Sequence, residues 1–182
     1  ILFLDAPPSH AFLHTGILAA SPDMYLRAGI GDSLTKHVES AFKSRGAELA
    51  YTDRLGLAAA KAGYETLMSI GVQALRDAAA GHDSAVFRLA CQFCILNTGF
   101  VSLMVREAFN GALAHSLFYA LRDFPGFSEC LHGDLVAWGS VVQLMLEGRK
   151  LEAAKLAGFL ETIGIAPSLQ RRGISFPSPE LL

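Results

Sequence analysis

Apolar residues along most of the chain recur every three or four positions, the spacing of an amphipathic helix, and glycines or prolines separate the segments. Several segments end at a glycine, as the C-cap preference of helices predicts. Strand-like alternation is confined to the first ~20 residues, where prolines interrupt it. The last nine residues, which include two prolines, are predicted to form an extended exit segment without a helix. We therefore predict an all-α fold, a bundle of about seven or eight helices. The expected helices cover residues 22–29, 31–46, 53–81, 83–100, 105–123, 133–148 and 150–164.

The composition is that of a globular chain with a substantial core. The 182 residues are 52% hydrophobic and 18% charged, and the formal net charge is −2. That apolar content excludes disorder, and the length suits one domain or one lobe of a larger protein. Without a basic block there is no electrostatic case for nucleic acid or for an anionic membrane as a partner.

Three cysteines are too few, and odd in number, for a disulfide framework, so we expect a reducing, cytoplasmic location. The start lacks a basic stretch followed by an apolar one, so no signal peptide is predicted. Because the first residue is Ile instead of Met, we expect the chain to be a fragment.

The stretch LACQFCILNTGFVSLMV, between Arg88 and Arg106, contains 17 uncharged residues. A membrane-spanning helix needs about 20, and this stretch contains Gln92 and Asn97 among other polar residues. We predict a central, buried helix of a soluble bundle.

Two small groups of metal-binding residue types are interpreted as structural. Cys91 and Cys94 form a CxxC pair inside an apolar helix, with no second pair, so core packing is favoured over zinc or redox chemistry. His10 and His14 have i, i+4 spacing, but the flanking prolines and Gly16 argue against the helix that a metal site would need.

A third group is more promising. His115 lies within an apolar helix and His132 opens the next one, with a turn around Pro125-Gly126 between them. The two imidazoles can face each other across this helical hairpin, although each alone could be a core histidine or a cap. Asp32, placed before a predicted helix, is either its N-cap or a third ligand. A set of two nitrogens and one oxygen leaves one open position on a tetrahedral zinc ion.

Four motifs resemble the C-terminal half of glycerol dehydrogenase-like proteins, in the iron-containing alcohol dehydrogenase and dehydroquinate synthase superfamily. They are AGIGDSLTK, NGALAHSLFYAL, HGDLVAWGSVVQLMLEG and FLETIGIAPSLQRRGIS, in that order. The resemblance covers the chain from about Ile17 to its end. It implies that residues 1–182 form the helical metal- and substrate-binding lobe of a two-lobed fold.

The resemblance also implies the chemistry. Asp32, His115 and His132 correspond to the metal ligands of the family, for Zn²⁺ or alternatively Fe²⁺, and no catalytic residue beyond these ligands is implied. The expected function is an NAD-dependent, metal-assisted alcohol or polyol dehydrogenase that acts on a vicinal diol or a 2-hydroxy acid. NAD would be held mainly by an N-terminal lobe that this chain lacks, and no GxGxxG motif is present. The expected partners are that lobe, a small alcohol substrate and a second copy of the chain.

Two departures from the family pattern bear on the substrate. Asp134 follows His132-Gly133 where the family has Glu, and Phe118 stands where the family often has a second histidine. Two alternative functions stay open: a dehydroquinate synthase-like or glycerol-1-phosphate dehydrogenase-like relative, and a non-catalytic helical interaction module. Dehydroquinate synthase-like enzymes usually have Glu at the position of Asp32, which disfavours the first alternative.

Overall fold

The computed structural model of the protein describes residues 8–168 and 170–172. Every regular element in this part is helical, so the all-α prediction is confirmed. The first seven residues of the expected strand region and the expected exit at residues 174–182 lie outside the described residues. In chain order the elements are α1 (Thr15–Ala19), α2 (Asp23–Lys43), α3 (Tyr51–Ala79), α4 (Ala85–Gln92), the π-helix η1 (Phe93–Asn97), α5 (Thr98–Met104), the 3₁₀ turn η2 (Glu107–Phe109), α6 (Leu113–Leu121), α7 (His132–Leu146), α8 (Lys150–Thr162) and the 3₁₀ turn η3 (Gln170–Arg172).

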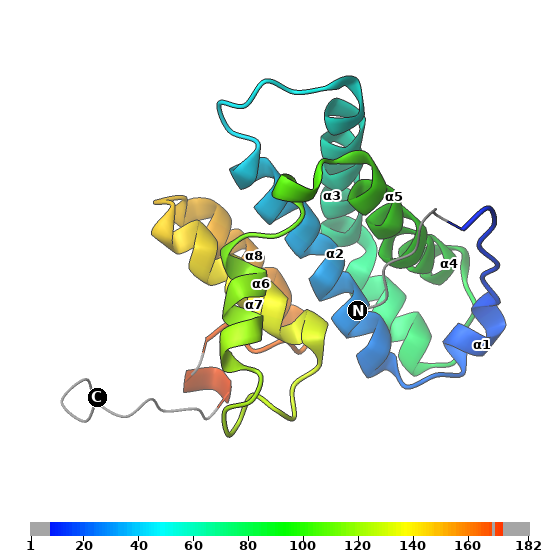
Figure 1. Ribbon diagram of the computed structural model, residues 1–182. Coiled ribbons are helices and arrows are strands. Elements are labelled where there is room, and N and C mark those ends of the chain that lie inside the picture. Colours follow the sequence, from blue (N-terminus) through cyan, green and yellow to red (C-terminus); the bar gives the residue numbers. More distant parts are fainter. Residues whose placement is uncertain (1–7, 169, 173–182) are drawn as a thin grey trace.

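Helix α2 runs through the middle of the bundle and joins its two halves. It packs against α3 on one side and against α7 on the other. Figure 1 shows α4 and α5 beyond α3, whereas α6 and α8 accompany α7. Side chains that α2 directs toward α7 therefore contact residues of the α6–α7 hairpin, which is distant from α2 in the sequence.

The two helices predicted for residues 22–29 and 31–46 are one continuous helix, α2, so that prediction is wrong. Neither Gly29 nor Gly31 ends a helix; Gly31 serves close packing against α7, whereas a Cβ atom on Gly29 would make only ordinary van der Waals contact. A Cβ atom on Gly31 would lie 2.6 Å from the carbonyl oxygen of Gly133, and one on Gly29 would lie 3.5 Å from Cβ of Cys94. Asp32 consequently lies in mid-helix, which excludes the N-cap interpretation; Pro22 occupies the N-cap position.

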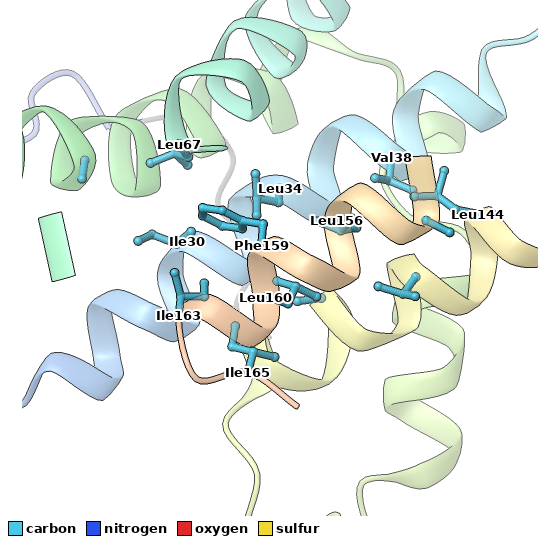
Figure 2. Close-up of a cluster of buried hydrophobic side chains, with 14 of the residues drawn as sticks. Ile30, Leu34, Val38, Leu67, Leu144, Leu156, Phe159, Leu160, Ile163 and Ile165 are labelled. Atoms are coloured by element: carbon cyan, nitrogen blue, oxygen red, sulfur yellow. The ribbon is translucent and has the colours of Figure 1, made fainter. Parts of the chain in front are cut away.

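The main hydrophobic core fills the space between α2, α3, α7 and α8. Figure 2 shows α8 contributing a row of apolar side chains that face those of α2 and α3. Burial of one such side chain contributes about 1.5–3 kcal/mol, so this core fixes α7 and α8 against α2. Its largest members are Ile30, Leu34, Leu67, Leu144, Leu156, Phe159, Leu160, Ile163 and Ile165.

The apolar segment from Ala85 to Met104 is peripheral, so the prediction of a central, buried helix is wrong. Only 22% of its most apolar window is buried, because among the described residues it packs mainly on α3, with smaller contacts to α2 and α1, and its opposite face is exposed. Asn97 lies on the packed face, where its side-chain amide donates to the carbonyl of Ala59 at 3.1 Å. By length and composition alone the segment could cross a membrane, a test that core helices of soluble proteins also pass. The uncovered large side chains are Leu89, Ile95, Leu96, Phe100 and Leu103.

We expect Gly133→Ala to destabilise the fold strongly, because a Cβ there would lie 1.8 Å from the carbonyl oxygen of Ala28. Overpacking typically costs about 1–3 kcal/mol, and here the clash is with backbone of α2, so the cost should reach or exceed that range. Gly158 on α8 is the matched control, since a Cβ added there would meet no atom within 4 Å, and Gly158→Ala should gain up to about 1 kcal/mol. Denaturant unfolding of both variants measures the free energies. Equal stability of Gly133→Ala and the unmodified chain would contradict the packing described for α2 and α7.

Candidate metal centre

Three side chains predicted to bind a metal converge from three helices. Asp32 comes from α2, His115 from α6 and His132 from the first position of α7. Oδ1 of Asp32 lies 3.6 Å from Nε2 of His132 and 3.9 Å from Nε2 of His115. One ligand atom from each residue lies within 4.8 Å of the other two. Neighbouring ligand atoms of a tetrahedral zinc ion are about 3.3–3.5 Å apart, so a small contraction would complete a coordination site.

The predicted helical hairpin brings the two histidines together. The rings of His115 and His132 lie 5.3 Å apart, centroid to centroid, across the α6–α7 pair. Gly139 allows this close approach, because a Cβ there would be 2.8 Å from Cα of Ala114. Gly139 therefore lets α7 lie close to the start of α6, next to His115.

An ion pair holds the start of α7, and with it His132, against α2. Arg27 donates to both carboxylate oxygens of Asp134, at 2.9 and 3.3 Å. Bidentate pairs of this kind fix geometry as well as adding energy. Asp134, the family departure next to His132-Gly133, thus ties the first turn of α7 to Arg27 on α2.

Asp32 has the properties of a cation ligand. Its Oδ1 is buried and makes no hydrogen bond with any residue that the structure describes, although buried polar atoms nearly always have a partner. Burial raises the pKa of Asp32, but the imidazole of His132, the ammonium of Lys36 and the imidazole of His115 outweigh burial and keep the pKa below its usual value. A buried, ionised oxygen without a donor, facing two imidazole nitrogens, fits a divalent cation.

Glu39 supports the site from behind His115. Its carboxylate is 2% exposed, and Oε2 lies 2.5 Å from Nδ1 of His115. Oε1 accepts the backbone N–H groups of Ala112 and His115 at 2.7 and 2.9 Å. Burial alone would raise the pKa of Glu39, but the contact with His115 and the two backbone donors keep it below its usual value. Sequence reasoning missed this residue, although its spacing of seven from Asp32 is two helical turns and places both on one face of α2.

Phe118 covers one side of His132. The two rings meet edge to face, with centroids 4.3 Å apart. His132 is the most exposed of the three candidate ligands, at 41% of its side chain, against 30% for Asp32 and 18% for His115. The site is therefore closed by an aromatic ring on one side and open to solvent beside His132.

Neither of the two groups interpreted as structural belongs to this cluster of ligands in the described part of the chain. Cys91 and Cys94 are free thiols, and burial raises their pKa to about 11 and about 12, so neither is a ready thiolate ligand. His14 caps α1 through Nδ1, which accepts the N–H of Ile17 at 3.2 Å. These positions agree with packing and capping roles.

Comparison with known proteins shows which proteins this chain resembles in sequence and in fold. No family model matches the chain. The chain is 31% identical over 154 residues to hydroxycarboxylate dehydrogenase A of Escherichia coli (strain K12), covering 84% of this chain and 42% of that protein. It is 29% identical over 183 residues to the glycerol dehydrogenase of Escherichia coli O6:H1 (strain CFT073), covering 98% and 49%.

A solved structure gives the same result. The probable glycerol dehydrogenase from Sinorhizobium meliloti 1021 superposes with a TM-score of 0.80 at 26% identity, over 91% of this chain and 47% of that one. The chain thus spans about half the length of the curated relatives it matches. Relatives and structural neighbours that cover most of the chain are glycerol dehydrogenases and related oxidoreductases, which confirms the resemblance to the glycerol dehydrogenase-like superfamily.

Proposed function

We propose that this chain is the C-terminal, metal- and substrate-binding lobe of an NAD-dependent, metal-assisted alcohol or polyol dehydrogenase. The observation that carries the proposal is the convergence of Asp32, His115 and His132 around the unpartnered Oδ1 of Asp32. The names of its relatives support an oxidoreductase. The N-terminal NAD-binding lobe of the same protein is the proposed partner, since this sequence contains no Gly-rich dinucleotide loop.

Asp32, His115 and His132 would hold Zn²⁺, or alternatively Fe²⁺. The metal would supply a Lewis acid that lowers the pKa of a hydroxyl in its open position. Asp32 contributes the negative charge, and the buried Glu39 holds the ring of His115. Phe118 keeps water from one side of His132. The overall reaction is reversible alcohol oxidation with hydride transfer to the nicotinamide of NAD.

Two substrate classes are candidates. A vicinal diol and a 2-hydroxy acid both present two neighbouring oxygens that can chelate one metal ion. The relative named as a glycerol dehydrogenase supports a vicinal diol, and the relative named as a hydroxycarboxylate dehydrogenase supports a 2-hydroxy acid. An apolar Phe118 ring beside His132 favours a substrate with fewer hydroxyl groups than glycerol.

Zinc titration of the chain tests the metal centre. We expect one Zn²⁺ per chain, and we expect Asp32→Asn to weaken binding at least about tenfold, because it removes the charge while keeping the shape. Asp123→Asn is the matched control, since the side chain of Asp123 is 84% exposed and outside the site. Competition with a chromophoric chelator measures both affinities. Equal zinc affinities for the two variants would reject the site, and an unmodified chain that binds no zinc would favour the non-catalytic interaction module.

A further inference from the structure

A buried carboxylate on α2 lies directly behind one of the three candidate ligands. Glu39 is among the few charged side chains in the described core, and both of its oxygens are used. Oε1 accepts two backbone N–H groups at the start of α6, those of Ala112 and His115. Oε2 lies 2.5 Å from the Nδ1 atom of the His115 ring. One carboxylate therefore holds both the backbone and the imidazole of the same residue.

This contact determines which nitrogen of His115 is protonated. An ionised carboxylate can only accept hydrogen bonds, so Nδ1 must carry the hydrogen in this contact. In the neutral ring the other nitrogen, Nε2, then has a free lone pair. Nε2 is the atom that lies 3.9 Å from Oδ1 of Asp32. The free lone pair is thus on the ring nitrogen nearest the centre of the three ligands.

We propose that Glu39 is a positioning residue for the metal centre, which holds His115 as the Nδ1–H tautomer with Nε2 ready to bind a divalent cation. The inference rests on the proposed function, because it assumes that the three residues bind a metal. Carboxylates in this position behind a metal-binding histidine typically contribute 10–100-fold to metal affinity. They do so by orienting the ring and by making its free nitrogen more basic.

If Glu39 only stabilised the fold, its replacement would lower stability without changing metal affinity. Oε1 satisfies two of the backbone donors that the start of a helix leaves free, so Glu39 also stabilises α6. Asp53 is a matched case far from the metal centre. It is 1% exposed, accepts the N–H of Ala50 at the start of α3 at 2.9 Å, and pairs with Arg106. Its replacement tests the loss of a buried, helix-capping carboxylate without any effect on a ligand.

The experiment compares Glu39→Gln with Asp53→Asn in the full 182-residue chain. The glutamine amide keeps the shape of the carboxylate, but its N–H₂ group must face either the Nδ1–H of His115 or the two backbone N–H groups. We expect Glu39→Gln to weaken Zn²⁺ binding about 10–100-fold and to change the visible absorption spectrum of the Co²⁺-substituted chain. We expect Asp53→Asn to lower the melting temperature without changing either metal readout.

A second measurement needs no variant of Glu39 and decides the question if Glu39→Gln does not fold. Nitrogen-15 NMR of the metal-free chain, at a pH where the ring is neutral, reports the tautomer of His115, assigned by comparison with His115→Gln. The proposal requires the Nδ1–H form, and a dominant Nε2–H form would overturn it. Unchanged Zn²⁺ affinity in Glu39→Gln would also overturn it while leaving the metal centre intact. A chain in which neither Zn²⁺ nor Co²⁺ binds would overturn the metal centre and this inference together.

Discussion

We expect the 182-residue chain alone to form NADH from glycerol, 1,2-propanediol or 2-hydroxybutyrate several orders of magnitude more slowly than the complete protein. Hydride transfer requires the nicotinamide to be held against the substrate carbon, and such positioning contributes on the order of 7–11 kcal/mol. The chain brings Asp32, His115 and His132 together as candidate metal ligands, but its sequence contains no GxGxxG motif of the kind that holds the phosphates of NAD.

The comparison requires the proposed two-lobed protein, produced from the coding region around this sequence, beside the 182-residue chain. Both are assayed for NADH absorbance after loading with zinc, at equal molar concentration and saturating NAD. A Gly-rich α/β lobe encoded upstream would support the proposed partner. Rapid, metal-dependent turnover by the lobe alone would mean that the dinucleotide binds to these helices.

We expect His132→Ala in the complete protein to abolish turnover. Two ligands from the chain hold zinc poorly, and the loss of a Lewis acid worth several kcal/mol lowers the rate on the order of a thousandfold or more. His82→Ala is the matched control, because the side chain of His82 is 68% exposed and lies beside Asp77, outside the site. The measurement is kcat together with metal content for both variants. Metal-dependent activity that survives in His132→Ala would remove this residue from the mechanism.

The helical class and the convergence of the two histidines could both be predicted from the sequence. Apolar spacing at helical period predicts helices directly, and a turn at Pro125-Gly126 leaves few arrangements for His115 and His132 other than a hairpin. The pairing of the two histidines thus depended on local signals, namely two helices in succession and the connection between them, whereas Asp32 on α2 was assigned to the site through the family resemblance.

Other features could not be predicted, because they depend on contacts between distant segments. Gly29 and Gly31 interrupt the helical pattern of the sequence, yet α2 continues through them, and at Gly31 the missing side chain lets the backbone of α7 pack closely. The same cause explains the misplaced segment from Ala85 to Met104, because its apolar content does not reveal that, among the described residues, it packs mainly on α3, with smaller contacts to α2 and α1. Glu39 could have been found from its seven-residue spacing to Asp32, but its partner on α6 is visible only in the structure.

Anomalous diffraction at the zinc edge, from crystals of the 182-residue chain grown with zinc, would show directly whether the three residues bind a metal. We predict a strong peak bounded by Oδ1 of Asp32 and Nε2 of both His115 and His132, at about 2.0–2.2 Å from each atom. Zinc at Cys91 and Cys94, or only at surface histidines, with the three proposed ligands unbound, would contradict the proposed metal centre.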